Sequence, residues 1–116
     1  CGWELGRSLM QSEYLPDAVV AINDMVAIGT IKYLESEGVH VPRDISVIGF
    51  DDISISSLVS PALTTIVQPA AETGRLAAQI LLNRLDGIEV TDSNVILSPK
   101  LMERGSVRRL HKKVKR

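Results

Sequence analysis

Short polar side chains lie at the carboxyl ends of three strongly apolar, strand-like runs in the sequence. They are Asn23, Asp24, Asp51, Asp52 and Gln68. Ligands of open parallel sheets bind in the crevice outside the carboxyl ends of the strands, so we expect these residues to meet at one edge. A carboxylate accepts two hydrogen bonds, and a carboxamide both accepts and donates them. The set therefore suits a small ligand that is rich in hydroxyl groups.

Each of these five positions also has a plainer interpretation. Asn23 or Asp24 could cap the helix that follows the first run. Asp51 and Asp52 could be turn residues, and Gln68 could face solvent. The hypothesis of a ligand site depends on all of them lying at the same edge of the sheet.

Other kinds of site have little support in the sequence. His40 and His111 are isolated and Cys1 has no partner, so a zinc-type site is not indicated. Two adjacent Asp residues without a third acid nearby make a poor Mg²⁺ site, and a glycosidase pair of converging carboxylates is not evident. The sequence contains neither a nucleophile elbow nor a P-loop. We therefore expect no catalytic residue, no metal and no cofactor.

The alternation of apolar runs with amphipathic stretches predicts an α/β fold. The expected strands are 18–22, 45–50, 64–68 and 94–97, and the expected helices are 2–13, 24–37 and 70–86. Because the strands are apolar throughout, we expect a parallel sheet with helices on both faces, which is a three-layer sandwich.

Charge is unevenly distributed along the 116 residues. All 14 Asp and Glu but only six of the 13 Lys and Arg lie in residues 1–103, whereas residues 104–116 hold the other seven. The acidic body is a poor surface for nucleic acid, and we expect the basic tail to be a solvated chain end. No apolar run approaches the roughly 20 residues of a membrane helix. The single cysteine excludes an internal disulfide and is compatible with a reducing cytosol.

The sequence resembles the effector-binding core of the LacI/GalR family of transcriptional repressors from about Gly2 to Val107. The stretches that carry the resemblance, in this order and spacing, are AINDMVAIG, VPRDISVIGFDD, PALTTIVQP and LMERGS. The resemblance implies a fold of the type I periplasmic-binding-protein kind, of which this chain would be a fragment of the C-terminal subdomain. The family's helix-turn-helix, its first lobe and the start of its second lobe are expected to lie upstream.

The resemblance also implies roles for single residues. Effector-binding positions would be Asn23, Phe50, Asp51 and Gln68. The Asp51 carboxylate would hydrogen-bond to effector hydroxyls or polar ring atoms. Phe50 would lie beside the pocket and pack rather than stack on the ligand.

Five further residues have secondary or interface roles in the same comparison. Asp24 would be a helix cap and Asp52 a turn or hinge contact. The helix 24–37 resembles part of the family's dimer interface, with Ile28 central and Leu58 and Val59 nearby. The alternative is that these apolar residues are ordinary core.

The family's chain path implies how the sequence is divided between lobes. Residues 1–68 would belong to the C-terminal lobe, 69–98 would cross to the N-terminal lobe, 99–109 would return, and 110–116 would form the basic tail. Leu76, Ile80, Leu81 and Leu85 would then face the other lobe. Without that lobe, we expect the fragment to self-associate, to swap this helix between copies or to reposition it.

The sequence therefore predicts a module that senses a sugar or related effector and dimerises, within a cytoplasmic repressor. Operator DNA would be bound as a homodimer through the upstream helix-turn-helix, and neither enzymatic activity nor a membrane is expected. The alternative is a fragment of a periplasmic sugar-binding protein that serves a transporter or chemotaxis system. A signal peptide on the parent gene would favour the alternative, whereas an upstream helix-turn-helix would exclude it.

Overall fold

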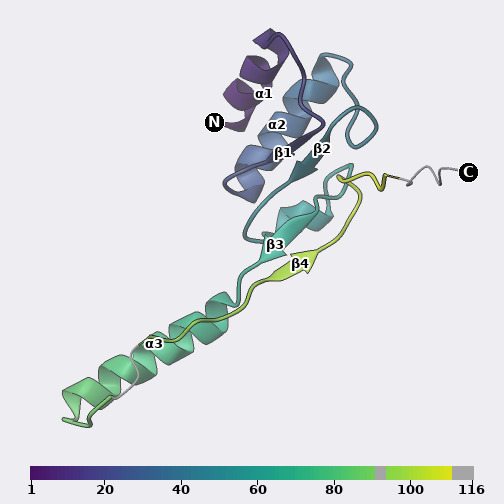
Figure 1. Cartoon of the computed structure of the whole chain (residues 1–116). Coiled ribbons are helices and arrows are strands. Elements are labelled where there is room, and N and C mark those ends of the chain that lie inside the picture. The colour runs from purple at the N-terminus through teal and green to yellow at the C-terminus, as the bar shows by residue number, and fades with distance from the viewer. Residues whose placement is uncertain (91–93, 111–116) are drawn as a thin grey trace, which may run out of the picture. The chain divides into compact units, whose positions relative to one another are not determined.

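The computed structural model describes residues 1–90 and 94–110, and the chain divides into two compact units (Figure 1). The first, here called the sheet unit, comprises Cys1–Val67 and the chain from Leu101 onward. The second, here called the helical unit, is Gln68–Lys100. The predicted basic tail and His111 lie outside the described residues, except for Leu110.

The sheet unit alternates helices and short strands. Its elements are α1 (Gly2–Gln11), β1 (Ala18–Val20), α2 (Asp24–Ser36), β2 (Ser46–Ile48), a 3-10 turn η1 (Ser54–Ser57), β3 (Thr65–Val67) and β4 (Lys100–Met102), whose first residue belongs to the helical unit. The strands β1 and β2 are parallel, with Val19 opposite Val47. A parallel bridge between Ile48 and Thr64 continues the ladder toward β3, and β3 neighbours β4. The predicted α/β order with parallel strands is present, although each strand is shorter than expected.

The core of the sheet unit is aliphatic, as the near absence of aromatic residues requires. Ala27, Ile31 and Leu34 recur at helical spacing on α2 and are buried against Val47 of β2 and the other core residues. Gly38, with φ of 81°, ends the helix region because glycine adopts this left-handed conformation without steric cost. In β1, Ala18 and Val20 are exposed and Val19 between them is half-buried.

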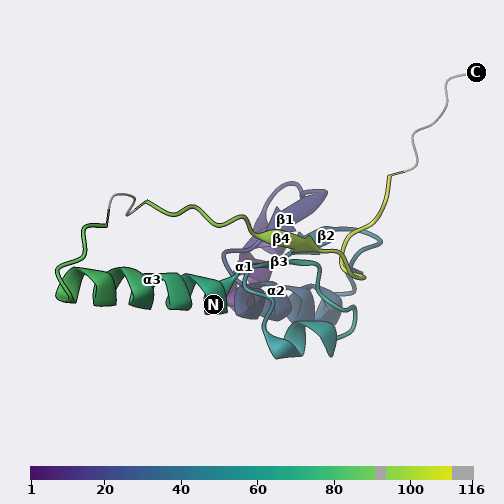
Figure 2. The same cartoon turned by 90° about the horizontal axis from the view of Figure 1, so that it is seen from below.

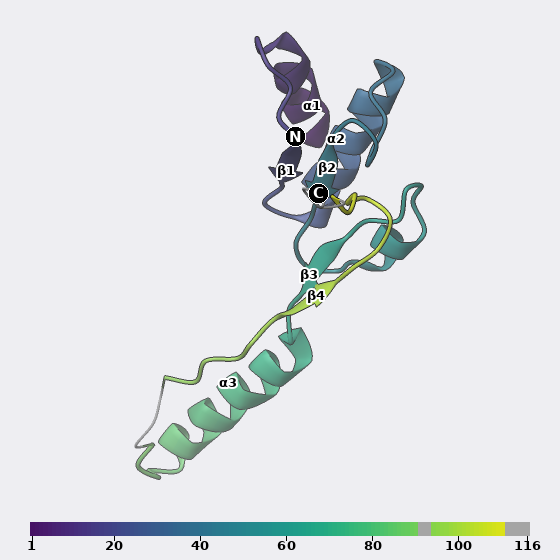
Figure 3. The same ribbon diagram turned by 45° about the vertical axis from the view of Figure 1, so that its right-hand side comes forward.

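The helices α1 and α2 lie side by side in the sheet unit (Figure 3). Gly2 and Gly29 let the two backbones approach, since a Cβ added at Gly2 would lie 2.2 Å from the carbonyl oxygen of Val26. The Thr30 hydroxyl donates to the Gly2 carbonyl at 3.1 Å across this contact. Trp3 packs edge to face against Tyr33, with ring centroids 4.9 Å apart.

The helical unit consists of α3 (Ala70–Leu85) and an extended return segment that runs back along it (Figure 2). The strand predicted at 94–97 is wrong: in the described residues 94–99 no strand forms, and β4 comes later at 100–102. Val95 and Leu97 pack on α3 instead, so their apolar character reflects contact with a helix and not a place in a ladder.

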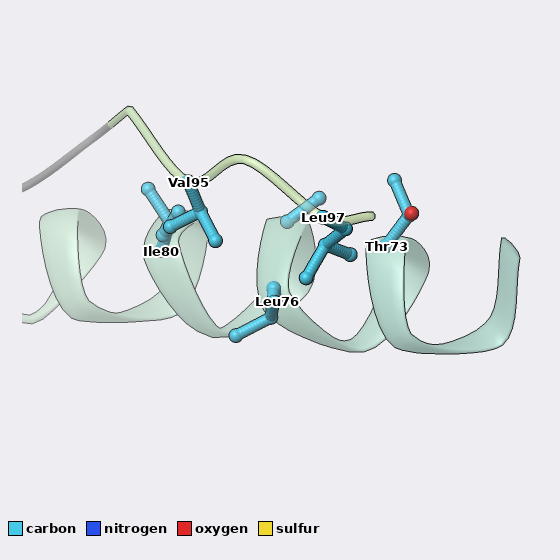
Figure 4. Close-up of a pocket in the computed structure, with 6 residues that line it drawn as sticks. Thr73, Leu76, Ile80, Val95 and Leu97 are labelled. Atoms are coloured by element: carbon cyan, nitrogen blue, oxygen red, sulfur yellow. The ribbon is translucent and has the colours of Figure 1, made fainter. Parts of the chain in front are cut away.

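The apolar stripe of α3 is only partly covered. Leu76 and Ile80 are half-buried and line a hollow of about 150 Å³ together with Val95 and Leu97 (Figure 4). Leu81 and Leu85 are exposed. The expectation that all four residues face another lobe of the whole protein stays a prediction. The return segment is a single extended chain and covers too narrow a strip of the helix.

Candidate functional site

The loops that follow β1 and β2 meet at one edge of the sheet unit. The backbone N–H of Asp24 donates to the carbonyl of Phe50 at 2.9 Å, which joins the two loops. The N–H of Asp51 donates to the carbonyl of Ile66 in β3, also at 2.9 Å. The edge predicted from the strand ends therefore brings Asn23 close to the Asp51 loop.

Asn23 is the N-cap of α2. Its side-chain oxygen accepts a hydrogen bond from the N–H of Val26 at 2.9 Å, which satisfies one of the free donors at the start of the helix. The cap uses only the oxygen of the carboxamide, so the NH₂ group can still donate to a ligand. The cap and ligand interpretations of Asn23 are compatible with each other.

Asp51 and Asp52 both have left-handed backbone angles, with φ of 108° and 53°. Consecutive positive φ values are costly for residues with a Cβ and persist only where the surroundings hold them. Asp51 is exposed at this turn, and its neighbour Phe50 is half-buried. A strained turn that presents a carboxylate at a strand end is typical of a binding loop.

Asp52 forms an ion pair within the fold. Its Oδ1 lies 2.6 Å from Nη1 of Arg104, and both side chains are 18% exposed. The contact is ionic, because Oδ1 has no well-aligned hydrogen bond in the structure. Arg104 also donates from Nη1 to the Leu63 carbonyl at 3.0 Å and from its backbone N–H to the Thr64 hydroxyl. Asp52 thus ties the turn to the LMERGS stretch, which sequence reasoning did not pair with it.

Asp24 does not cap the helix, because Asn23 does, and the prediction of a capping role is wrong. Its carboxylate is fully buried and accepts hydrogen bonds from the Ile53 N–H and the hydroxyls of Ser56 and Thr65. Sequence reasoning missed Ser56 and Thr65. Nothing in the local sequence separates Ser56 from the exposed serines beside it.

Gln68 is exposed and begins the helical unit, where its backbone carbonyl accepts a hydrogen bond from Ala70 at 2.8 Å. Its proposed contact with an effector stays a prediction.

The predicted interface residues divide between core and surface. Ile28 and Val59 are half-buried and pack against the core, whereas Leu58 is 80% exposed. Met25 and Ile55 are also exposed apolar residues of this region of the chain. Ile28 and Val59 therefore contribute to the core of the sheet unit. Leu58 is the clearest of the three as a candidate for contact with a partner.

The family model described as a periplasmic binding protein-like domain matches residues 3–107. The chain belongs to this family. It is 41% identical over 105 residues to the ribose operon repressor of Escherichia coli strain K12, a match that covers 90% of this chain and 32% of that protein. It is 40% identical over 111 residues to the transcriptional repressor PurR of Haemophilus influenzae strain PittEE, covering 92% and 33%.

The fold also matches that of a solved structure. A LacI-family transcriptional regulator of Enterococcus faecium, solved with bound ribose, matches with a TM-score of 0.78 and 32% identity over 95% of this chain and 40% of that chain. The predicted fold class and the resemblance to the effector-binding core of LacI/GalR regulators are confirmed. The chain spans about a third of the length of the curated relatives it matches. These relatives are named as repressors and not as enzymes.

Among the described residues, none of the helices is both long and apolar enough to cross a membrane.

Proposed function

We propose that this periplasmic-binding-protein-like chain is the effector-sensing and dimerisation module of a LacI/GalR-type transcriptional repressor, with a sugar or sugar derivative as effector. The observation that carries the proposal is the exposed Asp51 carboxylate, held on a strained turn beside Asn23 at the carboxyl ends of the parallel strands. The named relatives support it, since one is a ribose operon repressor and one structure contains ribose.

The proposed chemistry is recognition without reaction. Asp51 accepts hydrogen bonds from neighbouring hydroxyls, and the NH₂ of Asn23 donates to a ring or hydroxyl oxygen. Phe50 packs beside the ligand and Gln68 is a further predicted contact. Residues 69–98 are proposed to cross to the other lobe of the whole protein, as in the family. The proposed protein is not an enzyme and acts in the cytoplasm.

The regulatory consequence follows from differential affinity. An effector shifts the balance between two arrangements of the whole protein only as far as it binds one arrangement more tightly. In the proposed repressor this balance sets the spacing of two helix-turn-helix heads on operator DNA. The alternative of a periplasmic sugar-binding protein has less support, because the relatives named above are repressors.

Replacing Asp51 tests the proposed ligand contact. In the natural protein that carries this sequence, we expect Asp51→Ala to weaken D-ribose binding by about tenfold or more, since charge-assisted hydrogen bonds contribute about 1.5–3 kcal/mol. Isothermal titration calorimetry measures the affinity. Glu37→Ala, an exposed acid at the far end of α2, is the matched control and should bind as wild type. Unchanged ribose affinity in Asp51→Ala would refute the role given to Asp51.

Replacing Leu58 tests the proposed homodimer. We expect Leu58→Arg to shift the natural protein toward monomer, because the interface would bury an unpaired charge. Sedimentation velocity at a series of concentrations measures the shift. Leu58 is 80% exposed, so the monomer itself should remain folded, as circular dichroism would show. A dimer as tight as wild type would place the interface elsewhere.

A further inference from the structure

Asp24 joins three segments that are far apart in the sequence. Its carboxylate has no exposed surface. One oxygen accepts from the N–H of Ile53 at 3.0 Å and from the hydroxyl of Ser56 at 2.5 Å, and the other accepts from the hydroxyl of Thr65 at 2.5 Å. The carboxylate thereby connects the start of α2, the loop after β2 and the strand β3.

The fold makes room for this buried acid. Burial of a carboxylate is expensive unless several donors satisfy it. Here three donors do so, and the position in the first turn of α2 adds the favourable field of the helix N-terminus. Gly49 supplies the space, because a Cβ at that position would lie 2.2 Å from Oδ1 of Asp24.

The loop that Asp24 holds is the one that carries Asp51. Two of the three donors belong to it, since Ile53 follows Asp51 by two residues and Ser56 lies in η1. The positive φ values of Asp51 and Asp52 need such external restraints if the turn is to keep one conformation. Asp24 restrains the turn through its bonds to Ile53 and Ser56, and the ion pair Asp52–Arg104 ties the turn to the chain after β4.

We propose that Asp24 is a positioning residue of the effector site: it makes no contact with the effector, and its buried carboxylate holds the loop 51–57 so that Asp51 faces the ligand. This inference rests on the function proposed above for Asp51. It assigns Asp24 a role that differs from the capping role expected from its place after a strand.

The first part of the test needs no ligand. In the natural protein without effector, we expect Asp24→Ala to speed amide hydrogen exchange at Ile53 by at least tenfold, because alanine has no side-chain acceptor for this N–H. Exchange at Val47, whose N–H donates to Ser106 within the core, should stay as in wild type. Asp44→Ala is the matched control, since Asp44 is a carboxylate that accepts a backbone N–H from His40 at 2.8 Å elsewhere on the surface.

The second part measures D-ribose affinity with Asp51 intact. We expect Asp24→Ala to lose at least tenfold in affinity. Thr65→Val removes one donor to Asp24 and is a milder change if Asp24→Ala does not fold; it should also weaken binding. Thr65→Ser keeps the hydroxyl and should bind as wild type.

The outcomes separate this inference from the proposed function. Unchanged exchange at Ile53, or an equal rise at Ile53 and Val47, would overturn the positioning role. Faster exchange at Ile53 together with unchanged ribose affinity would show that Asp24 holds the loop but does not position the effector site. If the wild type binds no ribose, ribose fails as the effector of the proposed function, and the ligand-free exchange experiment still decides whether Asp24 holds the loop.

Discussion

Gly49→Ala is expected to destabilise the sheet unit by about 3 kcal/mol, although it adds a single methyl group. The added Cβ would lie 2.2 Å from Oδ1 of Asp24 and 2.8 Å from a methyl carbon of Leu63. Overpacking of a close-packed interior costs about 1–3 kcal/mol. Displacement of the Asp24 carboxylate from its donors adds the cost of unsatisfied buried polar groups, about 1–3 kcal/mol.

The measurement is urea-induced unfolding followed by circular dichroism. Gly105→Ala is the matched control, because a Cβ there would meet its nearest neighbour at 3.6 Å, which is ordinary contact. In an Asp24→Ala background the cost of Gly49→Ala should shrink, since the clashing carboxylate is absent. A variant within about 0.5 kcal/mol of wild type would contradict the expected clash, as this is the usual range for substitutions that disturb nothing.

Ser106→Ala is expected to have the second large effect, a loss of about 3 kcal/mol in the free energy of unfolding. The Ser106 hydroxyl is fully buried, donates to the Val47 carbonyl at 2.6 Å and accepts from the Thr64 N–H at 2.8 Å. It therefore links β2 to the start of β3. Alanine removes two hydrogen bonds, each of about 1 kcal/mol, and leaves the Thr64 N–H buried without an acceptor, which costs about 1–3 kcal/mol.

The same urea titration tests this prediction. The backbone bond from the Val47 N–H to the Ser106 carbonyl, 2.9 Å long, is kept in Ser106→Ala, so the experiment isolates the hydroxyl. Ser36→Ala is the matched control, because its hydroxyl also donates to a carbonyl, that of Tyr33, but at an exposed position. Equal stability losses in the two variants would show that burial of the Ser106 bridge is unimportant.

The sequence predicted much of the candidate site because strand ends are a local property. An apolar run followed by short polar residues places those residues at the sheet edge, and parallel strands share that edge. Asn23 and Asp51 were found in this way, and the structure brings their loops together through the bond from Asp24 to Phe50. The helices α1, α2 and α3 followed from apolar spacing in the same local manner.

What covers an apolar residue is a matter of tertiary structure. The run at 94–97 has the composition of a strand, yet Val95 and Leu97 pack on α3. Hydrophobic periodicity predicts that side chains are buried, but it does not identify the element against which they pack. The strand β4 was missed for the same reason, since a three-residue segment acquires its identity from the neighbour it pairs with.

By itself, the sequence determined the α/β fold class, the family and the sheet edge at which the candidate site lies, because periodicity, strand-end composition and motif order are all readable along the chain. Tertiary structure alone decided which polar groups hold that edge in place. Asp24 accepts hydrogen bonds from Ser56 and Thr65, which lie 32 and 41 residues further along the chain. Ser106 donates to Val47, which lies 59 residues before it. Such bonds depend on which segments the fold brings together, so a serine that joins two strands has the same local sequence signal as one that faces water.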